Sequence, residues 1–155
     1  SIVREIIDVE ALRFRVQHPK AGAVLIFCGD IRNHSQKKEV SYLEYEAYES
    51  MAEKQISQVI EEANKKWQLH AVEVIHRIGK LAVKDCSIAI AVSTSHRSEA
   101  YEASRFIIDT IKHAAPIWKK EYFLDGPAMW SKGCEASSII EENAKIPEVV
   151  KKEVL

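Results

Sequence analysis

The chain of 155 residues has no excess charge of either sign. Its 22 lysines and arginines balance 23 aspartates and glutamates, which gives a formal net charge of −1. Without a basic field a protein does not attract nucleic acid nonspecifically, so any anion site must be a local cluster of cations. We therefore expect no nucleic-acid partner. With 46% hydrophobic and 29% charged residues, the composition is typical of a globular domain.

Long apolar runs are also missing. No stretch approaches the roughly 20 residues that span a bilayer, so we expect no membrane association. The first ten residues, SIVREIIDVE, contain acidic residues and lack the apolar core of a signal peptide. These absences favour an intracellular protein, located in the cytoplasm.

Cysteine is scarce, and metal-binding and nucleotide-binding motifs are absent. Cys28, Cys86 and Cys134 lie far apart in the sequence and form no CxxC pair, which argues against a disulfide framework or a zinc site. His34 and His76 belong to no recognised metal-ligand motif, so no metal site is expected. The chain contains no GxxxxGK[ST] or GxGxxG motif, and we expect no bound cofactor.

The hydrophobic pattern predicts one α+β domain with a mainly antiparallel sheet, because helices follow only some of the strands. The domain is expected over residues 1–130, followed by a tail over 131–155 that is partly ordered at best. Residues 11–16 are amphipathic and ambiguous, 31–39 read as an exposed loop, and 81–85 read as a turn. Strands are predicted over 2–7, 23–28, 41–48, 72–78, 87–92 and 117–124, and helices over 50–67 and from about 96 to 115.

The most informative segment, residues 94–121, places cations at both ends of an apolar helix. His96 and Arg97 stand at its start, where free backbone N–H groups favour a phosphate that an arginine can also bind. They can equally be a surface pair in the first turn. Lys112, near the end of the helix, either complements the helix dipole or is a desolvated lysine that exchanges protons.

A second group of charges follows this helix. On a strand, Lys119 and Glu121 share one face and Lys120 takes the other, so one lysine can face a pocket beside a carboxylate. Adjacent lysines are as often simply solvated. Arg32, in the loop after Gly29, is either exposed or able to close over an anion.

Five segments of the chain together resemble the large, catalytic subunit of molybdopterin synthase. The matching motifs are GAVLIFCGDIRNHS, LEYEAYESMAEKQI, VIHRIGKL, VSTSHRSEAYEASRFIIDTIK and APIWKKE, in the family's order, between about Gly22 and Trp130. The resemblance implies an α/β hammerhead fold with a smaller β subdomain. It also implies a homodimer within a heterotetramer, in which each thiocarboxylated, ubiquitin-like small subunit donates sulfur to cyclic pyranopterin monophosphate. The product is molybdopterin, made for molybdenum cofactor biosynthesis by a sulfur transferase.

By the same resemblance, Lys112 and Lys119 are the expected catalytic residues. Asp30 departs from the lysine that some family members carry beside the loop arginine, so its side chain is not expected to bind an anion. The substrate-binding positions carried over from the family are Asp30, Ile31, Arg32, His96, Arg97, Lys112, Lys119, Lys120 and Glu121.

Two further hypotheses follow from the sequence. His96 and Lys112 are separated by roughly 24 Å along one helix at 1.5 Å per residue, so we expect a pocket shared between two protomers. The alternative function is a noncatalytic module that binds a ubiquitin-like tail or a phosphate. A cysteine-based sulfur transferase would instead depend on Cys28 or Cys86.

Overall fold

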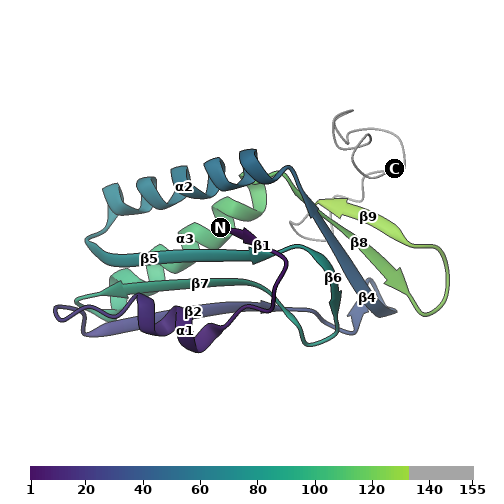
Figure 1. Cartoon of the computed structure of the whole chain (residues 1–155), viewed down its shortest axis with the longest axis horizontal. Coiled ribbons are helices and arrows are strands. Elements are labelled where there is room, and N and C mark those ends of the chain that lie inside the picture. Colours follow the sequence, from purple (N-terminus) through teal and green to yellow (C-terminus); the bar gives the residue numbers. More distant parts are fainter. Residues whose placement is uncertain (133–155) are drawn as a thin grey trace.

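The computed structural model describes residues 1–132, which form an α+β fold with a mainly antiparallel arrangement of strands, as predicted (Figure 1). None of the helices in this part of the chain is long and apolar enough to cross a membrane. The elements follow in the order β1 (Ile2–Val3), α1 (Val9–Arg15), β2 (Ala23–Asp30), β3 (His34–Ser35), β4 (Lys38–Ala47), α2 (Glu49–Lys66), β5 (Leu69–Arg77), β6 (Gly79–Ala82), β7 (Cys86–Thr94), α3 (Arg97–Ala114), β8 (Ile117–Phe123) and β9 (Met129–Lys132).

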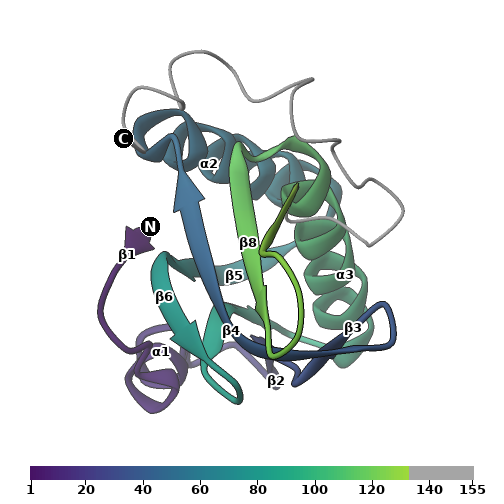
Figure 2. The same cartoon turned by 90° about the vertical axis from the view of Figure 1, so that its right-hand side faces the viewer.

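The strands form two sheets that meet at an angle. The body sheet has the order β1-β5-β7-β2, and its one parallel pair joins β1 to β5. The smaller sheet has the order β3-β4-β8-β9, with β6 also paired to β4. Figure 2 shows β4 and β8 running across the end of the body sheet. This angle leaves a space between the sheets at the end where β2, β5 and α3 approach β4 and β8.

Helices α2 and α3 cover one face of the body sheet. In α3 the buried positions recur every three or four residues, so this amphipathic helix turns its predicted apolar stripe inward. That stripe consists of Ala100, Ala103, Ser104, Ile107, Ile108 and Ile111. It packs with buried residues of α2 and with Ile88, Ile90 and Val92 of β7. Full burial of one such side chain, for example Ile107, contributes about 1.5–3 kcal/mol to stability.

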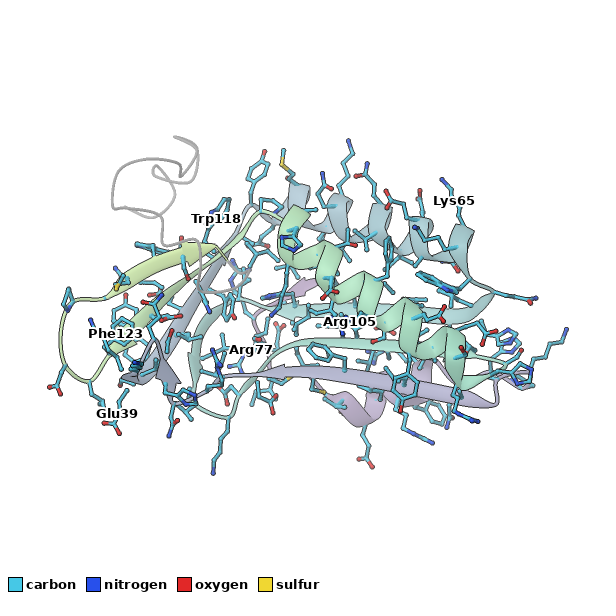
Figure 3. All side chains as sticks on the ribbon, turned by 180° about the vertical axis from the view of Figure 1, so that it is seen from behind. Glu39, Lys65, Arg77, Arg105, Trp118 and Phe123 are labelled. Atoms are coloured by element: carbon cyan, nitrogen blue, oxygen red, sulfur yellow. The ribbon has the colours of Figure 1, made fainter. Side chains whose placement is uncertain are left out.

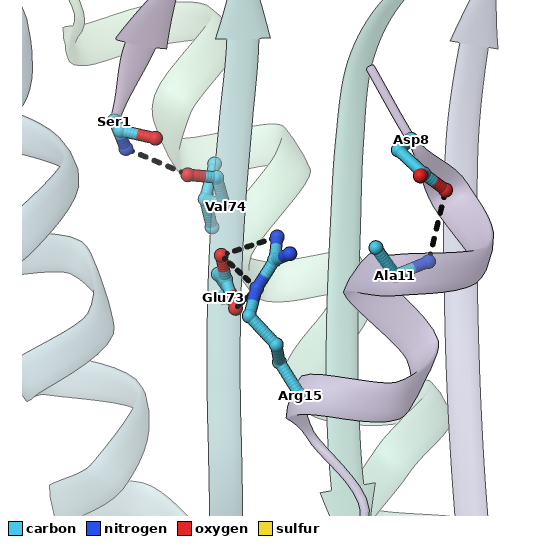
Figure 4. Close-up of polar contacts among 6 residues, drawn as sticks. All are labelled: Ser1, Asp8, Ala11, Arg15, Glu73 and Val74. Atoms are coloured by element: carbon cyan, nitrogen blue, oxygen red, sulfur yellow. Dashed lines mark hydrogen bonds and ion pairs between the residues drawn. The ribbon is translucent and has the colours of Figure 1, made fainter.

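The other face of the body sheet is covered by α1, the segment that the sequence left ambiguous. Asp8 caps this helix, since its Oδ1 accepts from the Ala11 N–H at 2.9 Å (Figure 4). Arg15 then reaches β5, where its Nε donates to both carboxylate oxygens of Glu73 at 3.0 Å. The strand predicted over 2–7 was wrong beyond Val3, because the chain bends at Arg4 and Glu5 before it enters the capped helix.

Three other segments differ from the sequence-based expectation. Residues 31–39 contain a hairpin between β3 and β4, turned by Gln36 and Lys37 at φ of 49° and 66°, a conformation typical of tight hairpins. The predicted turn over 81–85 begins later, because Leu81 and Ala82 still belong to β6 and pair with β4. Strand β9 (Met129–Lys132) was not predicted, and the part of the predicted tail beyond it lies outside the described residues.

Candidate active site

A cavity of about 570 Å³ lies between the two sheets. Its walls come from β2 and the segment after it, β4, β5, β7, the end of α3, and β8. Residues distant in sequence therefore converge there, which is typical of ligand pockets in this size range.

Three cations line this cavity, each on a different element. Arg32 follows β2, Lys112 lies in the last turn of α3, and Lys119 lies on β8. Arg32 and Lys112 are exposed, whereas Lys119 is half-buried. The desolvated environment considered for Lys112 is thus not present in the single chain. Asp30 and Glu121 also line the cavity, so its three positive charges exceed its two negative ones by one, and this local excess favours an anion on a chain with a net charge of −1.

Lys119 is held in place by a carboxylate. Its Nζ lies 3.2 Å from Oε1 of Glu121, and that glutamate is only 8% exposed. Lys119 and Glu121 are two residues apart on β8, so their side chains point to the same face, as the strand pattern predicted. That face lines the cavity. Lys120 points to the opposite face, where its Nζ lies 5.2 Å from the ring centroid of Tyr122. The fixed ion pair gives Lys119 a defined position, and Lys120 lines no part of the cavity.

The backbone that carries Arg32 is also fixed. The N–H of Ile31 donates to the carbonyl of Asp85 at 3.0 Å, and the carbonyl of Ile31 accepts from Lys84 at 2.9 Å. Ile31 itself is buried, whereas Asp30 is an exposed residue at the end of β2 that lines the cavity. These two backbone bonds anchor the start of the segment, so Arg32 extends from a rigid base.

The floor of the cavity contains three polar residues that the sequence analysis did not select. They are Tyr45 of β4, His76 of β5 and Ser87 of β7. The rings of Tyr45 and His76 meet edge to face, with centroids 5.1 Å apart, and the Ser87 hydroxyl donates to the Gly29 carbonyl at 2.9 Å. Burial raises the pKa of Tyr45 and lowers the pKa of His76 to about 4, so both are neutral at pH 7.

A sequence signal for this floor did exist. Tyr45 shares one face of its strand with the apolar Leu43 and Ala47, and His76 follows two apolar residues, Val74 and Ile75. A buried polar residue needs a partner or a function. That principle, applied to His76, would have selected it as a site candidate and not only as an unsuitable metal ligand.

His96 and Arg97 lie elsewhere in the single chain. His96 is the N-cap residue of α3, at the opposite end of the helix from Lys112, and both residues are exposed. They line a separate shallow hollow together with Ser98, Tyr101 and Glu102. The structure thus brings together Asp30, Ile31, Arg32, Lys112, Lys119 and Glu121. His96, Arg97 and Lys120 remain outside this group.

Neither described cysteine lines the cavity. Cys28 pairs in register with Ala89, whose side chain packs in the cluster under α1, and Cys86 packs beside that cluster. Burial, together with the neighbouring thiol of Cys28, raises the pKa of Cys86 to about 12. Within residues 1–132, no three histidine, cysteine, aspartate or glutamate side chains gather to hold a metal ion. The cavity therefore offers cations, carboxylates and neutral polar groups, but no thiol from these two residues.

Comparison with known proteins decides the family. The family model described as "MoaE protein" matches residues 2–114. The chain belongs to the MoaE family. The molybdopterin synthase catalytic subunit of Halalkalibacterium halodurans is 42% identical over 148 residues, covering 96% of this chain and 95% of that protein. The corresponding subunit of Thermoplasma volcanium is 47% identical over 116 residues, covering 75% and 85%.

A solved structure supports the same conclusion at the level of the fold. Molybdopterin synthase from Staphylococcus aureus superimposes with a TM-score of 0.79 at 42% identity, covering 84% of this chain and 94% of that chain. The MoaE assignment thus agrees with the resemblance carried by the five motifs. It also makes the cavity between the two sheets a feature of a MoaE protein, to be interpreted through the chemistry of its lining residues.

Proposed function

We propose that the chain is the catalytic subunit of a molybdopterin synthase and acts as a sulfur transferase. It moves sulfur from the thiocarboxylated C-terminus of a ubiquitin-like small subunit to cyclic pyranopterin monophosphate, forming the dithiolene of molybdopterin. The observation that carries this proposal is the convergence of Arg32, Lys112 and Lys119 on one cavity of a MoaE-family chain. We expect the enzyme to work in the cytoplasm.

The cations suit both the substrate and the reaction. The substrate carries a phosphate, and the donor carries a thiocarboxylate, so two anions must meet in one place. Sulfur transfer then passes through charged tetrahedral species, which fixed positive charges stabilise. Lys119, held 3.2 Å from Glu121, supplies a fixed charge. Lys112 has no ion-pair partner among the described residues and is the better candidate for moving a proton.

The site is completed by a second copy of the chain. His96 and Arg97 follow Thr94, the last residue of β7, at the end of that strand that is distant from the cavity. Thr94 pairs there with Ala23, the first residue of β2. Among the described strands β2 pairs only with β7, so its other edge is free, and Ala23 to Cys28 carry no charge. A long, apolar, uncharged edge strand is a typical site for pairing with another chain.

Antiparallel pairing of β2 with its copy has a geometric consequence. The eight residues of β2 span roughly 23 Å, close to the roughly 24 Å that separates His96 from Lys112 along α3. A two-fold pairing sets Ala23 of one copy against Asp30 of the other, next to Arg32. It thereby brings the partner's His96 and Arg97 toward the cavity, where they suit the phosphate.

The activity is tested by product formation from cyclic pyranopterin monophosphate and thiocarboxylated small subunit. We expect dithiolene from the wild type and a loss of about 100-fold or more in rate for Lys112→Ala. Lys65→Ala is the matched control, because Lys65 also lies in the last turn of a helix but at the far end of α2 (Figure 3). If the wild type binds the small subunit and forms no product, the noncatalytic alternative replaces the proposal.

The shared site is tested by mixing two inactive variants, Lys112→Ala and His96→Ala. Each mixed dimer contains one intact composite site, so equal mixing is expected to restore about a quarter of the wild-type activity. If the mixture stays inactive while both chains fold and dimerise, the shared pocket is wrong. Activity that survives thiol alkylation would exclude a mechanism through Cys28 or Cys86.

A further inference from the structure

The cavity has two chemically different parts. Its cations, Arg32, Lys112 and Lys119, are exposed or half-buried, whereas His76 and Ser87 on the floor are buried. Cations bind the anionic end of a ligand, but they donate hydrogen bonds and accept none. A ligand that also carries N–H groups needs acceptors, and the floor is where neutral acceptors are found.

The protonation of His76 follows from its contacts. Its Nδ1 lies 3.0 Å from the carbonyl oxygen of Arg77, which is an acceptor only, so Nδ1 carries the proton. Nε2 of the same neutral ring then holds a lone pair. The residue is 6% exposed, and burial lowers the pKa of the imidazole to about 4. At pH 7 the floor therefore presents an uncharged nitrogen acceptor.

The neighbouring polar groups on the floor are already occupied. The hydroxyl of Ser87 donates to the Gly29 carbonyl and also interacts with the hydroxyl of Tyr45. By contrast, Nε2 of His76 has no hydrogen-bond partner among the described residues. It is also not among the unpartnered polar atoms that are fully buried, so it retains access to solvent. Since His76 lines the cavity, this nitrogen is open to it. Edge-to-face contact with Tyr45 keeps the imidazole ring in this orientation.

We propose that His76 is a specificity-determining residue, whose Nε2 accepts a hydrogen bond from an N–H group of the ligand that the cations hold by its anionic end. This inference rests on the proposed function. Two ligands would then carry such a group into the cavity: the ring of the pterin phosphate, and the backbone amides of the small subunit's glycine tail. The same acceptor chemistry applies to both, and kinetics distinguishes them.

Two substitutions separate the structural nitrogen from the open one. His76→Asn keeps an amide N–H near the position of Nδ1, able to bind the Arg77 carbonyl, but has no group at the position of Nε2. His76→Gln extends its amide to the position of Nε2 and restores an acceptor there. Steady-state kinetics of both variants gives kcat and the KM for each substrate, and calorimetry gives the affinity of the wild type and the variants for each ligand alone.

The expected result is a KM about tenfold higher for one substrate in His76→Asn, and a KM within about threefold of wild type in His76→Gln. A rise for the pterin phosphate identifies its ring as the donor, and a rise for the small subunit identifies the tail. Val74→Ala is the stability control, because Val74 lies on the same face of β5 in the core but does not line the cavity. It should lower the melting temperature and leave both KM values unchanged.

Unchanged KM values in His76→Asn, or equal effects of Asn and Gln, would overturn the inference. If the wild type forms no product, the proposal of sulfur transfer is wrong. The ligand affinities measured by calorimetry then test the acceptor role of His76 on their own. Weaker binding of either ligand to His76→Asn than to His76→Gln would still support the acceptor role. If the wild type binds neither ligand, the acceptor role fails as well.

Discussion

The two ends of α3 present cations in different surroundings. At its C-terminal end, Lys112 joins Arg32, Lys119 and a buried carboxylate around a deep cavity built by two sheets. At its N-terminal end, His96 and Arg97 lie in a shallow hollow whose other residues come from the same helix. The first end gathers charges from several elements around one cavity and fixes one of them, Lys119, by its ion pair with Glu121, whereas the second end has residues of a single helix only. If the two ends serve one site, as proposed, the C-terminal end supplies most of it from one chain and the N-terminal end contributes through a second copy.

The largest difference in activity is expected between substitutions of two adjacent lysines that lie on opposite faces of β8. Lys119→Ala should lower kcat/KM by about 100-fold or more, because it removes a fixed cation and leaves the buried Glu121 unpaired. Lys120→Ala should change kcat/KM by less than about threefold, since Lys120 packs on aromatic rings outside the cavity. Steady-state kinetics gives kcat/KM for both variants. Equal losses of kcat/KM would show that the substitutions act by destabilising the strand and not by removing a charge from the cavity.

The second prediction concerns acid stability at the cavity end. The pKa of His76 is about 4 when folded, against 6.5 for a solvated histidine, so the unfolded chain binds a proton between these values that the folded chain does not. Stability must therefore fall as the pH falls from 6.5 toward 4. Between pH 7 and pH 5 this residue should cost about 2 kcal/mol.

Urea unfolding of wild type and His76→Gln at both pH values measures this contribution. The amide does not titrate, so the variant should lose about 2 kcal/mol less than the wild type on acidification. Parallel losses in the two proteins would mean that His76 becomes protonated in the folded state near its ordinary pKa, which would also remove the neutral acceptor from the cavity floor.

The fold could be predicted further from the sequence than the site could. Long periodic segments such as α3 and β7 are specified by local pattern, and the structure has both. Short elements were missed where the deciding contact is distant: β6 forms because Leu81 pairs with Leu43 of β4, and β9 forms because Trp130 pairs with Lys120. No local pattern reports such pairings.

The candidate site divides in the same way. Arg32, Lys112 and Lys119 were selected through motifs, and the structure places them around one cavity. His76 and Tyr45 were not selected, because their significance depends on burial and on facing each other from different sheets. The distance between His96 and Lys112, however, can be calculated from the helix rise and their separation in sequence. The sequence alone therefore supports the hypothesis of a second protomer.

A smaller effect is expected at the N-terminal end of α3. If the partner's Arg97 binds the substrate phosphate at the edge of the cavity, Arg97→Ala should raise the KM for the pterin phosphate about tenfold. The KM for the small subunit should stay the same. Arg105→Ala is the control, because Arg105 is an exposed arginine of the same helix whose partner is Asp109 one turn later (Figure 3). Equal KM values for the two variants would leave the N-terminal end of α3 without a role in substrate binding.

The smallest effect concerns a carboxylate beside this arginine. Glu102 lines the same hollow, and its Oε2 accepts from Nε1 of Trp67 at 2.8 Å. Glu102→Gln keeps an oxygen acceptor for Trp67 and removes one negative charge near the phosphate subsite. Because exposed charges are screened at physiological salt, the KM for the pterin phosphate should fall by only about twofold, and the change should disappear in high salt. A KM that does not respond to this charge at low salt would indicate that the phosphate binds at the Lys112 end alone, and that the two ends of α3 do not serve one site.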